Sequence, residues 1–133
     1  MSLFNVFDIS GSAMSAQSIR LNTIASNMAN ANVTASSPDA VYRAKEPIFQ
    51  SILNQHGVSQ VNVAGITELK VEPLKQYAPD HPQANEEGYV FRPNINLVDQ
   101  MANMISASRS YQSNVEVINT TKDMALQTLQ MGR

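Results

Sequence analysis

The chain of 133 residues contains no cysteine, so it has the size of one domain and cannot form disulfide bonds or thiolate metal sites. Its formal net charge of −2 gives no reason to expect a nucleic acid or an anionic membrane as a partner. Its hydrophobic content of 43% allows a core, but no apolar run reaches the length of a membrane span, and the first residues lack the basic and apolar regions of a secretory signal peptide.

Residues 5–33 are predicted to form a helix with one packing face. Four large apolar residues recur at intervals of seven: Phe7, Met14, Leu21 and Met28. Companion rows lie three residues further on, at Ser10, Gln17, Ile24 and Ala31, and four residues further on, at Gly11, Ser18, Ala25 and Asn32. Because such rows share one side of a helix, this segment is expected to pack against a second helix.

Charge is scarce in this first helix. Of the twenty charged residues, only Asp8 and Arg20 fall in positions 1–33, whereas twelve fall in 34–96 and six in 97–133. So few charges make a poor solvent-facing surface, and the many Ser, Asn and Thr residues are mediocre helix formers. We therefore expect both terminal helices to be marginal in an isolated monomer and to become ordered when neighbouring chains bury them.

The middle of the chain, residues 34–93, is predicted to be a small strand-and-loop insertion. Small polar residues and a proline make residues 34–40 a loop that ends the first helix. Residues 41–53 are expected to be extended, with Pro47 favouring an edge strand. A turn over residues 54–57 then leads into a second strand.

That second strand is expected over residues 58–71, where apolar side chains alternate with others. It should bend at a β-bulge around residues 64–65. Turns are expected at 77–82 and 85–88, before a short apolar run at 89–91.

Residues 94–131 are predicted to form a second, longer helix. It carries a row at intervals of seven and another four residues further on: Leu97, Met104, Tyr111, Ile118 and Ala125, then Met101, Ser108, Val115, Lys122 and Leu129. Asn96 is placed to cap its start, Asp99 opposes the dipole in its first turn, and Gly132 stands where it should stop. At 1.5 Å per residue it would span roughly 50 Å, so it needs a packing partner.

Heptad spacing at both ends predicts a mainly α fold with a small β/loop insertion. The two terminal helices are expected to pack as an antiparallel coiled-coil-like pair, with a central strand-rich segment. The expected organisation is an N-terminal helix of a helical core domain (1–33), the insertion (34–93) and a C-terminal helix of the same core domain (94–133).

Residues suited to catalysis are scarce. His56 and His81 are the only histidines, both in expected turns, and Asp80 beside His81 is better explained as part of a solvated turn than of a metal site. Glu86 and Glu87 are better explained as a solvated turn than as a carboxylate dyad, because neighbouring side chains on an extended segment would point apart. Phosphate-loop, nucleophile-elbow and dinucleotide-turn motifs are absent. We therefore expect no enzyme, no catalytic, cofactor or metal site, and no small-molecule substrate.

Two long motifs resemble signatures of the bacterial flagellar rod and hook protein family. Residues 21–32, Leu-Asn-Thr-Ile-Ala-Ser-Asn-Met-Ala-Asn-Ala-Asn, resemble the N-terminal signature, and residues 94–114 with Thr128-Leu129 resemble the C-terminal one. Three shorter segments are similar to the proximal-rod branch of that family: Tyr42-Arg43-Ala44-Lys45, His81-Pro82 and Gly88-Tyr89-Val90.

The resemblance implies a structural subunit of the basal-body rod, the drive shaft that crosses the periplasm of the bacterial flagellum and transmits torque. It implies export through the flagellar type III apparatus without a cleaved signal peptide. The implied partners are other copies of the chain, proximal and distal rod subunits, and the adaptor between the inner-membrane ring and the rod.

The residues expected to mediate assembly follow the helical rows and the asparagine-rich motif: Phe7, Met14, Leu21, Ile24, Asn27, Met28, Asn30, Asn32, Leu97, Met101, Met104, Tyr111, Val115, Ile118 and Leu129. Asn27, Asn30 and Asn32 are expected to satisfy backbone groups at the helix end or across subunits, and simple helix termination is an equally weighted interpretation. The methionines suit either a core or an adaptable interface.

Two other functions stay open at this point. A helical adaptor or secretion chaperone would be a stable small oligomer in dilute solution, unlike a rod subunit. An enzyme of unrecognised type is the more distant alternative.

Overall fold

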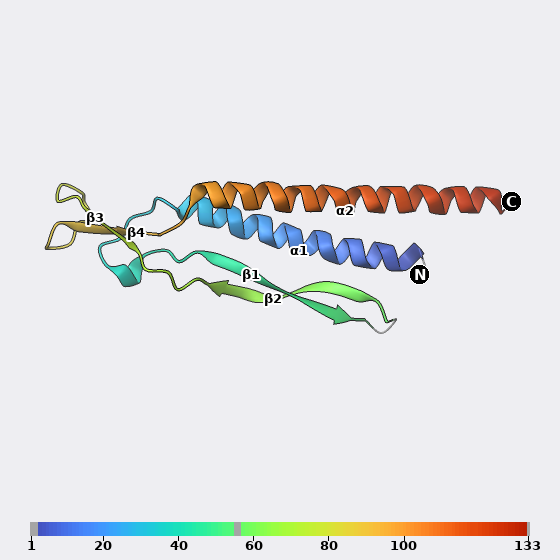
Figure 1. The fold of residues 1–133 in the computed structure, drawn as a ribbon, viewed down its shortest axis with the longest axis horizontal. Coiled ribbons are helices and arrows are strands. Elements are labelled where there is room, and N and C mark those ends of the chain that lie inside the picture. The colour runs from blue at the N-terminus through green and yellow to red at the C-terminus, as the bar shows by residue number, and fades with distance from the viewer. Residues whose placement is uncertain (1–2, 55–56, 133) are drawn as a thin grey trace.

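The computed structural model describes residues 3–54 and 57–132. Two long helices, α1 (Leu3–Asn30) and α2 (Leu97–Met131), run antiparallel and pack side by side along an elongated molecule (Figure 1). Both chain termini lie at one end of this molecule, and α2 extends past the start of α1 there (Figure 1). The expected mainly α fold, with two long terminal helices that pack together, is confirmed.

Four strands form two separate hairpins between the helices. The hairpin of β1 (Lys45–Leu53) and β2 (Ser59–Glu68) lies along α1, whereas β3 (Leu74–Tyr77) and β4 (Tyr89–Arg92) extend beyond the end opposite the termini (Figure 1). One turn of 3₁₀ helix, η1 (Pro38–Ala40), lies in the loop after α1.

Helix α2 begins with the predicted cap and ends next to the predicted glycine, although Gly132 has a φ of −86° and not the left-handed conformation of a glycine cap. The Asn96 side-chain oxygen accepts a hydrogen bond from the Val98 backbone N–H at 3.0 Å, and Asp99 lies in the first turn. At the other end, the Gly132 N–H donates to the Thr128 carbonyl at 3.2 Å. The start and the stop of this helix were therefore predictable from single residues.

The β1–β2 hairpin contains the predicted bulge. Ile48 is paired with Gly65 and Phe49 with Val63, so Ala64 is the extra residue on β2. Strand β1 begins four residues later than expected, because residues 41–44 lie outside the sheet. Val41 is buried in this segment before the strand. The turn between the strands closes with a hydrogen bond from the Gly57 N–H to the Asn54 carbonyl at 3.0 Å, and His56 lies outside the described residues.

The β3 strand was not predicted from the sequence. This strand, Leu74–Tyr77, is only four residues long, and all four are exposed, so neither of its faces packs on a core. A strand without a buried face leaves no clear pattern of alternating apolar residues in the sequence. It is held by pairing with β4, and β4 also forms an isolated bridge in which Ala35 and Phe91 exchange backbone hydrogen bonds of 2.8 and 2.9 Å.

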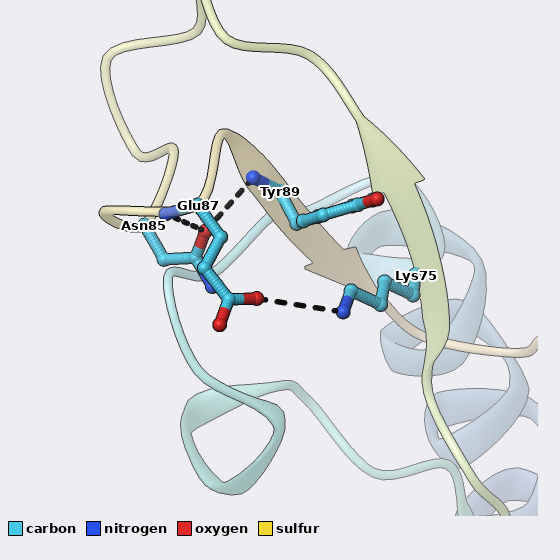
Figure 2. A network of polar contacts seen from close by, with 4 residues as sticks. All are labelled: Lys75, Asn85, Glu87 and Tyr89. Carbon is cyan, nitrogen blue, oxygen red and sulfur yellow. Dashed lines mark hydrogen bonds and ion pairs between the residues drawn. The ribbon is translucent and has the colours of Figure 1, made fainter.

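A small polar network fixes the turn between β3 and β4 (Figure 2). The Asn85 side-chain oxygen accepts from the backbone N–H groups of Glu87 at 3.1 Å and Tyr89 at 2.8 Å. The Lys75 ammonium lies 3.8 Å from the Glu87 carboxylate and 3.9 Å from the centroid of the Tyr89 ring. These contacts order a hairpin in whose two strands Val90 is the single buried residue.

The buried residues are mostly small. They are Ser10, Ala16, Thr23, Ile24, Asn27, Ala31, Val41, Val58, Val90, Pro93, Ala107 and Thr121. A valine and an asparagine, Val90 and Asn27, are the largest fully buried side chains among the described residues. A thin core of this kind leaves a chain of this length with little apolar burial to stabilise it.

We expect Gly88→Ala to open the β3–β4 hairpin. Gly88 has a φ of +81°, and a Cβ there would lie 3.1 Å from Cε2 of Tyr77 and 3.2 Å from Cβ of Pro79. The strain should cost about 1 to 3 kcal/mol of local stability. Hydrogen exchange of the β3 and β4 amides measures this.

Gly65→Ala is the matched control, because no atom lies within 4 Å of the added Cβ and φ is not positive there. Equal protection of the hairpin amides in both variants would contradict the strain at Gly88.

Candidate assembly surface

The face of α2 that meets α1 is lined by small and polar residues. Ala107 and Thr121 are buried, and Gln100 and Asn114 are half-buried, so a row at intervals of seven lies three residues after the predicted apolar row. The predicted row itself flanks this contact, with Met104, Tyr111, Ile118 and Ala125 all half-buried. In the expected companion row, four residues on, Met101, Lys122 and Leu129 are exposed.

On α1 the same distinction holds. Phe7, Met14, Leu21 and Met28 are half-buried, and the row three residues on is buried or half-buried at Ser10, Gln17, Ile24 and Ala31. The row four residues on, Gly11, Ser18, Ala25 and Asn32, is exposed. In both helices, therefore, the most buried row combines small side chains with medium-sized ones and lies next to the row of large apolar residues.

Polar side chains enter this contact because their own helix satisfies them. The Thr23 hydroxyl donates to the Ile19 carbonyl at 2.8 Å, and the Thr121 hydroxyl donates to the Val117 carbonyl at 2.7 Å. The side-chain oxygen of Gln17 is the exception, since it is buried and has no hydrogen-bond partner in the described part of the chain.

Asn27 connects three elements at the C-terminal end of α1. Its side-chain oxygen accepts from the Lys45 N–H at 2.9 Å and from the Tyr42 hydroxyl at 3.0 Å. Its amide nitrogen donates to the Lys45 carbonyl at 2.9 Å and to Oε1 of Gln100 at 3.4 Å. With only 2% of its surface exposed, Asn27 uses its amide to fix the start of β1 against both helices.

The other two asparagines of the motif have different surroundings. Asn30 donates to the Ser26 carbonyl at 2.8 Å within α1, and Asn32 is exposed beyond the end of the helix. Ser26 also hydrogen-bonds the Tyr42 hydroxyl at 3.1 Å. Asn27 thus satisfies backbone groups of a distant strand within its own chain, not those of its own helix end.

An open groove of about 340 Å³ lies beside Asn27, between both helices and β1. Arg20 donates to Oδ1 of Asn103 at 3.2 Å on its wall.

The described residues contain no group of three or more His, Asp or Glu side chains that could hold a metal ion. The ring of His81 accepts a hydrogen bond from the Gln83 N–H at 3.1 Å, which is a turn contact. Within the described ranges, neither helix is apolar over enough of its length to span a bilayer.

Comparison with known proteins identifies the chain at both ends and over its full length. The family described as "Flagella basal body rod protein" matches residues 7–35, and the one described as "Flagellar basal body rod FlgEFG protein C-terminal" matches residues 86–131. The flagellar basal-body rod protein FlgC of Yersinia enterocolitica is 49% identical over the full length of both chains. The chain belongs to the FlgC family of flagellar basal-body rod proteins.

Other FlgC proteins agree with this assignment. FlgC of Salmonella typhimurium is 46% identical over the full length of both chains, and FlgC of Aquifex aeolicus is 39% identical over 98% of this chain and 97% of its own. As a member of the FlgC family, the chain is a structural subunit of the flagellar basal-body rod.

The residues expected to mediate assembly fall into three groups in this FlgC-family chain. Ile24 and Asn27 are buried within the subunit. The half-buried group comprises Phe7, Met14, Leu21, Met28, Asn30, Met104, Tyr111, Val115 and Ile118. The exposed group comprises Asn32, Leu97, Met101 and Leu129. Only the last two groups have surface that a neighbouring rod subunit could contact.

Sequence reasoning missed part of the contact within the FlgC-family subunit. It did not single out Ala107, Asn114 and Thr121 on α2, or Tyr42 as a partner of Asn27. The α2 residues were detectable as a row of small residues at intervals of seven, next to the apolar row. The Tyr42 contact joins segments of the fold that no local pattern brings together.

We expect Asn27→Ala to lower the free energy of unfolding by about 3 kcal/mol, because the Lys45 N–H and carbonyl would lose their partner in a buried site. Asn32→Ala, an exposed residue of the same motif, should change it by less than about 0.5 kcal/mol. The measurement is urea unfolding, at a protein concentration where the helical signal of the unaltered chain is complete. Equal effects of the two substitutions would contradict the role given to Asn27.

Proposed function

We propose that this FlgC-family chain is a subunit of the proximal rod and that it assembles through its two terminal helices. The helices of many copies pack side by side along an axial tube. Within each copy α1 packs against α2 in a coiled-coil-like arrangement, with the heptad rows flanking the contact, and faces rich in Ser, Asn and Ala lie between copies. The assembled tube transmits torque across the periplasm by contact and not by chemistry.

The exposed surface of the helices is the observation that supports this proposal most. Val98, Met101, Ile105 and Leu129 are large apolar residues of α2 that are exposed in the single chain. On α1 the exposed row of Gly11, Ser18 and Ala25 is uncharged, and Gly11 has no neighbouring atom within 4 Å of an added Cβ. A solvated helix face normally carries charges, so these faces favour contact with other subunits.

The proposal divides the chain into a helical core made by residues 1–33 and 94–133, and a bracing insertion made by residues 34–93. The insertion carries twelve of the twenty charged residues, which suits an outer position against solvent and neighbouring subunits. The proposed partners are other copies, proximal and distal rod subunits, the adaptor to the inner-membrane ring, and the flagellar type III export apparatus. The chain is proposed to be exported without a cleaved signal peptide and to have no catalytic activity.

We expect Leu21→Asp or Tyr111→Asp to abolish rod assembly while expression persists. Each substitution places a carboxylate in a half-buried helical row, where the loss of hydration around a charge is costly. Swimming in soft agar and the presence of the chain in isolated basal bodies measure the effect. Leu21→Met and Tyr111→Phe, which keep apolar volume, should preserve motility, and a motile strain carrying either aspartate would refute the proposal.

We also expect the purified chain to have low helix content in dilute solution. Helices α1 and α2, of 28 and 35 residues in a chain of 133, make up nearly half of it in the folded structure. With few charges and a thin core they should gain helix content as concentration rises, which circular dichroism measures. A fully helical, stable small oligomer at low concentration would favour the adaptor or chaperone alternative.

A further inference from the structure

The β1–β2 hairpin is uncharged over most of its length. Residues 47–67 contain no Asp, Glu, Lys or Arg. Large apolar side chains of β1 are nevertheless exposed, among them Ile48, Ile52 and Leu53, and 70% of the Leu53 surface is accessible. An exposed apolar surface without charges is typical of a surface that another protein covers.

The outer edge of β1 is free only beyond its start, where the Asn27 amide pairs with both backbone groups of Lys45. The sheet has two strands, and the Val61 N–H of β2 donates to the Ser12 hydroxyl of α1 at 3.2 Å, so α1 meets the outer edge of β2. In the described part of the chain no strand other than β2 pairs with β1. Proteins usually protect such an edge with charges or with proline, and beyond Pro47 this edge has neither.

The C-terminal turns of α2 form a second surface of the same kind. Residues 124–132 carry no charge, and this part of α2 projects past the start of α1 (Figure 1). Leu126, Leu129 and Met131 are exposed there, with 71% of Leu129 and 82% of Met131 accessible. This tail and the β1–β2 hairpin both extend toward the end of the molecule that holds the termini (Figure 1).

We propose that the tail of α2 in one copy packs against the β1–β2 hairpin of a neighbouring copy in the rod. This inference rests on the proposed function. Joining these two surfaces covers the exposed apolar residues of both, and no charged group of either surface loses its hydration. The centres of protein interfaces are depleted of charged residues in the same way.

The geometry of such a contact suits a rod. A helix tail and a hairpin are different surfaces, so the contact is heterologous: the copy that gives its tail keeps a free hairpin, and its neighbour keeps a free tail. It therefore extends from copy to copy, whereas a hairpin paired with another hairpin would close into a dimer.

Cysteine crosslinking tests the contact, because the chain has no cysteine of its own. Leu53→Cys and Leu129→Cys are placed on two separate copies of the gene, expressed together in cells that lack the unaltered chain, and basal bodies are isolated and oxidised. We expect a disulfide-linked dimer of the chain that neither variant gives alone, because the Cα atoms must approach within about 7 Å.

Val98→Cys combined with Leu53→Cys is the matched control. The accessible fraction of Val98, 72%, is close to the 71% of Leu129, but Val98 lies at the opposite end of α2. The pair with Val98→Cys should therefore give no dimer. A dimer with Val98→Cys instead, a dimer from Leu53→Cys alone, a crosslink to a different rod protein, or no crosslink in basal bodies that contain both variants would each overturn the proposed contact. All of these results leave the proposed rod function standing.

A charge-pairing experiment covers cysteine variants that fail to enter the basal body. Leu53→Lys and Leu129→Glu should each reduce swimming, and the two together in one chain should restore it, because each tail then meets an opposite charge on its neighbour. A double variant that swims no better than the worse single variant overturns the contact. Failure of the unaltered chain to enter basal bodies would instead refute the proposed function.

Discussion

The buried amide of Asn27 is the interaction on which the arrangement of this subunit depends. It pairs with both backbone groups of Lys45, so one side chain takes the place that a neighbouring strand would have in a sheet. Because Tyr42 and Gln100 complete its hydrogen bonds, the amide also fixes the loop before β1 and the first part of α2. A group that is fully satisfied while buried gives the fold a specific arrangement that a thin core of small residues could not.

The second constraint is the shortage of charge and of large buried side chains in the helices. Small residues at the contact bring α1 and α2 together, and the threonine hydroxyls there are satisfied within their own helices. Large apolar residues such as Met101 and Leu129 are left outside. The single subunit therefore buries small apolar and polar side chains between its helices and leaves several large apolar ones exposed, which suits a member of the FlgC family that functions within an assembly.

Sequence reasoning recovered the features that local residues determine. Asn96 and Gly132 marked the ends of α2 because capping chemistry is local, and the bulge at Ala64 followed from the break in alternation on β2. The buried row of α2 lies three residues after the predicted apolar row and was missed because apolar size was given more weight than close approach. The β3 strand and the contact of Asn27 with Lys45 depend on tertiary pairing, which no local pattern encodes.

The cross-helix hydrogen bonds are unevenly distributed along the molecule. Those of Arg20 with Asn103 and of Asn27 with Gln100 both join the C-terminal half of α1 to the first turns of α2. Toward the termini, the buried Thr121 hydroxyl instead bonds within its own helix and so adds no hydrogen bond between the two helices. Local opening consequently costs less free energy near the termini than near the loops, and the subunit is elastically graded along its axis, from a stiff end to a compliant one.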